Sequence, residues 1–95
     1  MYIQFTVNIV WDEPKRTANI HKHRGLDFAT LTEEFFLAAL VRPARGSRYT
    51  AIGEDINGVI CVVFAVYGIE GISVISMRPA STKEKELYRE HCKNA

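Results

Sequence analysis

An apolar run of eight residues, 59–66 (VICVVFAV), is the feature that most limits how this chain can fold. A strand that is apolar at nearly every position, and not only at every second one, is typical of the centre of a sheet with both faces covered. The pair Asn57-Gly58 comes directly before the run and is typical of a two-residue hairpin, because both positions accept a positive φ. We therefore expect a strand over residues 49–54 to pair with the apolar strand across this turn.

The remaining elements follow from alternating apolar residues and from side chains that can cap helices. Alternation predicts two further strands, over residues 3–11 and 72–79. Helices are expected at about 13–23 after Asp12, at 27–40 after Asp27, and at 82–92 after the capping box of Ser81 and Glu84. A loop is expected over 42–47. The predicted order is β-α-α-β-β-β-α, an α+β domain with one antiparallel sheet and helices packed on it.

Length and composition fit one small globular domain over residues 1–95, with an apolar fraction of 47%. The formal net charge is only +1, so a role with nucleic acid must depend on clustered charge. Apolar runs fall short of the roughly 18–20 residues that cross a bilayer, and the first residues do not resemble a signal peptide. Cys61 and Cys92 have no zinc-binding spacing. We expect a cytoplasmic protein with reduced thiols, no metal, no cofactor and no membrane contact.

Two segments of the chain share their order and spacing with a known protein family. The first segment contains Trp11-Asp12-Glu13-Pro14-Lys15, then Asn19, Lys22-His23, Gly25 and Phe28. The second contains residues 75–80 (ISMRPA), then Lys83-Glu84 and Tyr88. Together they resemble the BrnT family of ribonuclease toxins from bacterial type II toxin–antitoxin pairs, over about residues 7–91. Each piece alone is a weak signal, and the combination is specific.

The resemblance carries several implications that composition and periodicity do not. It implies a RelE-like fold and an endoribonuclease that cleaves RNA without a metal ion and inhibits translation. It also implies a BrnA-like antitoxin that neutralises the toxin and binds the promoter, so that this chain would reach promoter DNA only through the complex. The isolated chain is expected to be a monomer or a dimer.

Metal-independent RNA cleavage needs a group that moves protons and cations that hold the phosphate, and four residues fit these roles. His23 is the natural proton carrier and Lys22 a phosphate cation; alternatively, a histidine at a helix end interacts with the helix dipole. Arg78 ends the last strand and suits phosphate, with an ion pair to Glu84 or Glu86 as the alternative. Arg48 is the second arginine candidate, with a solvated arginine at the edge of a loop as its alternative.

Other polar and aromatic residues have structural interpretations. Trp11 is expected to anchor the core rather than to stack on a base, and Tyr88 and His91 are expected to pack. Lys15 and Asn19 are one helical turn apart, and they fit local structure as well as a ligand.

The chain departs from the family at the turn between the last two strands. Family members usually carry arginines there, whereas residues 65–73 (AVYGIEGIS) contain none and include Glu70. Loss of local positive charge weakens binding to a phosphate backbone. The alternative function is therefore a weak or inactive relative that acts mainly as a binding module in an antitoxin complex.

Overall fold

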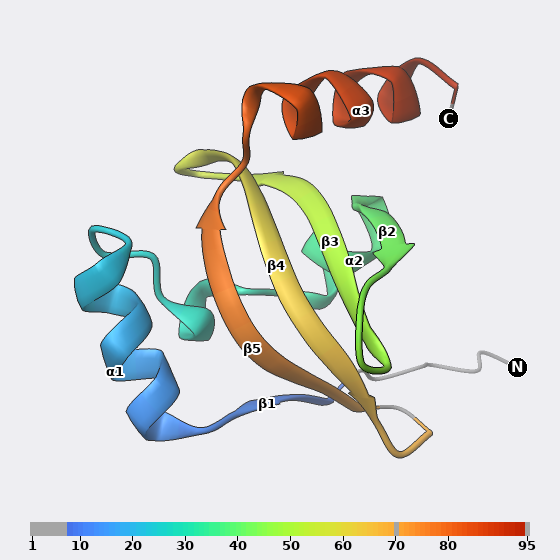
Figure 1. Ribbon diagram of the computed structural model, residues 1–95. Helices are drawn as coiled ribbons and strands as arrows, with labels where there is room; N and C mark the ends of the chain where they lie inside the picture. The colour runs from blue at the N-terminus through green and yellow to red at the C-terminus, as the bar shows by residue number, and fades with distance from the viewer. Residues whose placement is uncertain (1–7, 70, 95) are drawn as a thin grey trace, which may run out of the picture.

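The computed structural model describes residues 8–69 and 71–94, which form a sheet flanked by helices (Figure 1). The elements are β1 (Asn8–Trp11), α1 (Glu13–Lys22), the 3-10 helix η1 (Phe28–Thr30), α2 (Glu33–Ala38), β2 (Leu40–Pro43), β3 (Arg48–Asp55), β4 (Gly58–Tyr67), β5 (Gly71–Pro79) and α3 (Thr82–Lys93). The predicted α+β class and the order of its elements are confirmed. The short strand β2 is an addition to the predicted set.

The strands lie in the order β1-β5-β4-β3-β2, so the apolar strand β4 is central, as predicted. Its residues Ile60, Cys61 and Val62 are buried although they point to alternate faces. Strands β2 to β5 pair antiparallel, whereas β1 pairs parallel with β5. The sheet is therefore mixed, with one parallel strand at its edge, and the prediction of an antiparallel sheet is wrong for β1. The part of the first predicted strand that falls on residues 1–7 lies outside the described residues.

The predicted hairpin lies between β3 and β4, but its turn is one residue earlier than the sequence suggests. Asp55 pairs with Gly58, so Ile56 and Asn57 occupy the turn. The Asp55 carboxylate accepts a hydrogen bond of 2.7 Å from the Asn57 backbone N–H, and Gly58 alone takes the positive φ, at 104°. Glycine adopts such a φ without strain, which explains its place at the start of β4.

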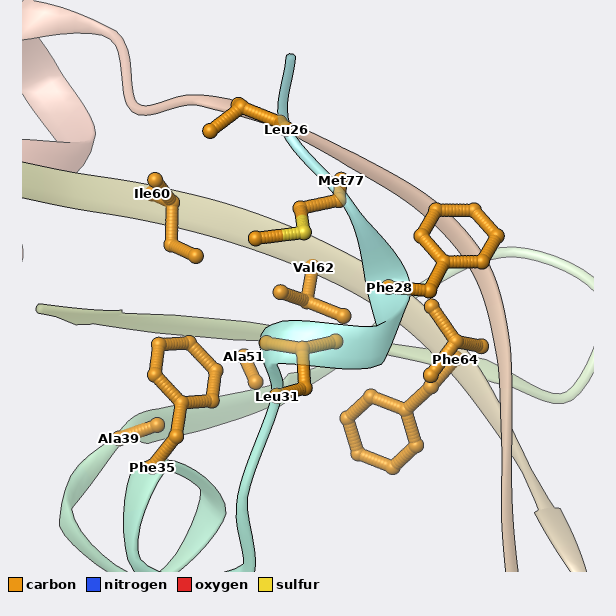
Figure 2. Close-up of a cluster of buried hydrophobic side chains, with 11 residues drawn as sticks. Leu26, Phe28, Leu31, Phe35, Ala39, Ala51, Ile60, Val62, Phe64 and Met77 are labelled. Atoms are coloured by element: carbon orange, nitrogen blue, oxygen red, sulfur yellow. The ribbon is translucent and has the colours of Figure 1, made fainter. Parts of the chain in front are cut away.

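The main core lies on one face of the sheet, where η1 and α2 cover β3, β4 and β5 (Figure 2). Phe28 from η1 is fully buried, and Phe35 from α2 packs over β3. The close approach of α2 requires Gly53, because a Cβ there would lie 2.7 Å from the Phe35 ring. Trp11 packs against this core, as predicted.

Among the described residues, 8–69 and 71–94, only α3 covers the opposite face, and it does so at one end of the sheet (Figure 1). A small cluster of Ile52, Cys61 and Ala80 packs there, with Tyr88 of α3 against it. The capping box of Ser81 and Glu84 begins this helix, as predicted. Beyond α3 the face carries half-buried residues, and we call this part the open face; its central row is Thr50, Val63 and Ser76.

The predicted helix over residues 27–40 is wrong in its extent. Asp27 caps only the single turn η1, and the chain is extended at Leu31. Thr32 then caps α2, which ends at Ala38, and Leu40 begins β2. The apolar spacing of Phe28, Leu31 and Phe35 is helical, yet it is equally satisfied by two short helices that contact the same core.

Candidate functional site

The first helix, α1, is fastened to the half of β5 that has β4 on one side but no described strand on the other. β1 pairs with β5 only from Gly71 to Val74, so the backbone groups of Met77 need another partner. The buried side chain of Asn19 supplies it. Its amide oxygen accepts from the Met77 N–H at 3.0 Å, and its nitrogen donates to Met77 O at 2.9 Å and Leu26 O at 3.1 Å. Asn19 thus has the structural role that the sequence left open.

This attachment places two predicted site residues, Lys22 and His23, in one hollow beside β5. The hollow has a volume of about 270 Å³ and is lined by Lys15, Ala18, Asn19, Lys22, His23, Ile75 and Ser76. Lys22 is exposed and His23 is half-buried, and the backbone N–H of His23 closes the helix on Asn19 O at 2.9 Å. Two lysines and a histidine therefore border one hollow at the surface of the protein.

A second network holds α1 on its other side. The Arg16 guanidinium donates to both carboxylate oxygens of Asp27, at 2.7 and 3.0 Å, and to Glu13 at 3.1 Å. Trp11 Nε1 also donates to Glu13, at 2.6 Å. The hydrogen bond from Arg16 is the main cause that lowers the pKa of Asp27, and the one from Trp11 is the main cause that lowers the pKa of Glu13. These acids are thus occupied by structural partners.

Arg78 forms the ion pair that was the alternative to phosphate binding. Its NH1 and NH2 groups donate to the two Glu84 oxygens at 2.7 and 2.9 Å, and NH1 also donates to Pro79 O at 3.3 Å. A guanidinium has five N–H donors, so two of them are left over for an anion. The side chain of Arg78 is 39% exposed, which keeps those donors accessible.

Glu84 serves both as the partner of Arg78 and as part of the helix cap. Its Oε1 accepts from the Ser81 backbone N–H at 2.9 Å. The hydrogen bond from Arg78 is the largest cause that lowers the pKa of Glu84, from its ordinary value of 4.5 to about 2. The carboxylate is therefore charged at every pH at which the protein would work.

This pairing predicts a stability that depends on pH. Because the folded-state pKa of Glu84 is depressed, the stabilisation is complete above pH 4.5 and is lost as the pH falls toward about 2. Glu84→Gln keeps a side chain suited to the cap but removes the charge. We expect it to lower the free energy of unfolding by about 2 kcal/mol near neutral pH, a figure already reduced for solvent screening. Urea unfolding of both proteins across the acid range measures this.

The matched control is Glu86→Gln, because Glu86 is exposed on the same helix. It should unfold like the wild type at each pH. A constant difference between Glu84→Gln and the wild type, down to about pH 2, would contradict the assignment of the pH dependence to Glu84.

The fourth predicted residue, Arg48, begins β3 and is exposed on the open face. Strand register places Arg48, Ala65 and Ser73 in one row across this face. The row that contains Arg78 and Cys61 lies four residues away along β4, which is roughly 13 Å. The structure therefore places Arg48 and Arg78 on one face without direct contact.

A further arginine, Arg42, lies on the same face and was not among the predicted site residues. It pairs with Thr50, in the row that continues to Val63 and Ser76, and it is exposed. Since Ser76 also lines the hollow beside α1, this row joins the hollow to the arginines. Arg42 could not be placed on this face because β2 was not predicted. Alternation of apolar residues within a four-residue strand that contains a proline is too short to detect.

Two other features of the described ranges, 8–69 and 71–94, bear on function. No three His, Cys, Asp or Glu side chains among these residues gather in a group that could hold a metal ion. None of the helices formed by them is long and apolar enough to cross a membrane.

Known proteins with a similar sequence or structure give the family of this chain. The family model described as "Ribonuclease toxin, BrnT, of type II toxin-antitoxin system" matches residues 11–84, most of the chain. The chain belongs to the BrnT family. A 1.1 Å crystal structure of the ribonuclease toxin BrnT from Brucella abortus is 54% identical, with a TM-score of 0.74. The match covers 81% of this chain and 100% of the Brucella chain, and no curated protein sequence matches.

The BrnT match contains most of the site described above. It begins at Trp11, in the network that holds α1, and ends at Glu84, the partner of Arg78. All four predicted site residues lie within it. The BrnT-like segment thus includes both the hollow beside α1 and the arginines of the open face.

Proposed function

We propose that this chain is an endoribonuclease toxin that cleaves RNA by acid–base chemistry without a metal ion and thereby inhibits translation. The observation that carries the proposal is the hollow of Lys22 and His23, which is continuous through Ser76 with the open face. An imidazole and several cations that surround one accessible surface are the groups that RNA cleavage requires.

In the proposed reaction, His23 accepts the proton of a ribose 2′-hydroxyl. The 2′-oxygen attacks the adjacent phosphorus, the bond from phosphorus to the 5′-oxygen breaks, and that oxygen takes a proton from a water molecule as it leaves. The products are a 2′,3′-cyclic phosphate and a free 5′-hydroxyl. Lys22, Arg48 and the free donors of Arg78 offset the negative charge that builds on the phosphate. The requirement for a 2′-hydroxyl restricts the reaction to RNA.

The partner follows from the family. A type II toxin family implies an antitoxin, and we propose that it is BrnA-like, neutralises this chain in the cytoplasm and brings it to promoter DNA within the complex. A dimer of the isolated chain is part of the same proposal.

Purified protein incubated with RNA in excess EDTA tests the proposed chemistry. We expect cleavage that the chelator leaves unchanged. Arg48→Ala should lower kcat/KM about ten-fold, because one charge-assisted contact with phosphate is lost. Arg89→Ala is the matched control, since Arg89 is exposed on α3, and it should behave like the wild type. Complete inhibition by EDTA, or equal rates for the wild type and Arg48→Ala, would contradict the proposal.

One observation favours the second candidate function, a binding module without nuclease activity. Glu84 occupies two of the five N–H donors of Arg78, so this arginine is less available to phosphate than a free one. An undetectable rate at high protein concentration, together with intact binding to the antitoxin, would support this function.

A further inference from the structure

A second hollow lies at the end of the open face that is farthest from α3. It has a volume of about 390 Å³ and is lined by Asn8, Tyr67, Gly68, Ile69 and Gly71. The hollow lies at the turn between β4 and β5. It is not part of the cleavage site proposed above, and its chemistry is aromatic and amide rather than cationic.

Tyr67 is positioned in this hollow by the glycine opposite it. Tyr67 pairs with Gly71, and a Cβ on Gly71 would clash first with the Tyr67 backbone oxygen and would also lie 2.8 Å from the Tyr67 Cδ1 atom. The absence of a side chain on Gly71 therefore lets the ring rest against β5. Tyr67 is nevertheless 64% exposed. Its ring therefore lies against Gly71 on one side and is open to solvent on the other.

Asn8 lies on the other side of the same glycine. It pairs with Gly71 in the parallel register, so Asn8, Gly71 and Tyr67 form one row across the open face. The amide of Asn8 offers both a donor and an acceptor, which is what recognition of a base edge requires. Tyr67 and Asn8 thus combine a stacking surface with a hydrogen-bonding group.

Two arginines lie on the strands beyond Tyr67, on the side of the sheet away from α1. Arg48 pairs with Ala65, two residues from Tyr67 along β4, which is about 7 Å. Arg42 follows in the next row, and Ser76 at the end of that row lines the hollow of Lys22 and His23. A nucleotide whose base lies on Tyr67 would therefore have its phosphate within reach of Arg48.

We propose that Tyr67 and Asn8 form a binding site for an unpaired base of the RNA substrate, with the phosphate of that nucleotide within reach of Arg48. The inference rests on the proposed ribonuclease function and makes the substrate single-stranded. Unpaired bases stack on aromatic side chains with little dependence on sequence, whereas bases in a duplex are covered by their neighbours. Stacking at Tyr67 supplies affinity at the turn that lacks arginines.

The test measures binding of a 2′-O-methyl single-stranded oligonucleotide, which cannot be cleaved because its 2′-oxygen is blocked. Tyr67→Ala should weaken binding about ten-fold, and Tyr67→Phe should bind like the wild type, because stacking needs only the ring. The matched control is Val66→Ala: Val66 is 60% exposed but points to the opposite face, and its loss should have no effect. An abasic oligonucleotide of equal length should bind Tyr67→Ala and the wild type equally.

Three outcomes would overturn the base site. Equal affinity of Tyr67→Ala and the wild type for the single strand is the first. An equal loss for the abasic oligonucleotide is the second, because it would show a general effect on charge or folding. Weakened binding to the antitoxin with unchanged RNA affinity is the third, because it would make the exposed Tyr67 and Ile69 a protein-docking surface.

The two proposals can fail separately. If binding depends on Tyr67 but no RNA is cleaved, the base site stands and the nuclease proposal is wrong. If RNA is cleaved and binding does not depend on Tyr67, the nuclease proposal stands and the base site is wrong.

Discussion

Replacing His23 with alanine should lower the rate of RNA cleavage by about 10²- to 10⁴-fold, the contribution typical of a positioned proton carrier. His23 is half-buried at the end of α1 and shares its hollow with Lys22 and Ser76. The alanine variant keeps the backbone bond to Asn19 O that closes the helix, so its fold should be retained. Single-turnover cleavage of a labelled RNA measures the chemical step.

The same helix offers a matched control for this experiment. His21 is also in the last turn of α1, but it is exposed and does not line the hollow. His21→Ala should therefore cleave at the wild-type rate and should respond to pH as the wild type does. An equal loss of cleavage rate in both variants would point to the helix dipole or to net charge. A wild-type rate in both variants would show that His23 carries no proton in the reaction.

Removing the Asn19 side chain should have the largest effect on stability. Asn19→Ala would leave three buried backbone groups without their partners, the N–H and C=O of Met77 and the C=O of Leu26. Each such loss costs about 1–3 kcal/mol, and water that enters the gap recovers part of it. We expect the free energy of unfolding to fall by about 3 kcal/mol, as measured by urea denaturation.

Thr17→Ala is the control for the helix itself, because Thr17 is exposed on α1. It should change the free energy of unfolding by less than about 0.5 kcal/mol. Asn19→Asp separates the bonds further: it keeps the acceptor for the Met77 N–H but loses the donor to both carbonyl oxygens. A stability of Asn19→Ala close to that of the wild type would contradict the role of Asn19 as the fastening of α1.

The parts of the fold that could be predicted are those with a local cause. The apolar residues 59–66 had to be covered on both faces, and Ser81 with Glu84 forms a cap within four residues. The parallel pairing of β1 with β5 has no local cause, because it joins Asn8 to Gly71. This pairing depends on how the intervening residues build the rest of the sheet.

The candidate site could be predicted in part for the same reason. The resemblance pointed to Lys22 and His23, which α1 brings together by sequence proximity. For Arg78 the sequence left two possible acidic partners, Glu84 and Glu86. Glu84 is the partner because the helix cap holds its carboxylate beside the end of β5. Arg42, Tyr67 and Asn8 could not be grouped with Arg48, because only the register across four strands places them on one face.

The lengths of the strands have a consequence for solubility. The outer strand β2 has four residues, whereas the inner strands β3, β4 and β5 have eight to ten. Outer strands with free backbone groups are templates on which other chains add and fibres grow, and a short strand that contains a proline is a poor template. Pro43 ends β2, and Asn19 occupies the backbone groups of Met77 on the outer side of β5, so these two places offer little on which a neighbouring molecule could extend the sheet. The fold thereby resists aggregation at the β2 edge and at this end of β5.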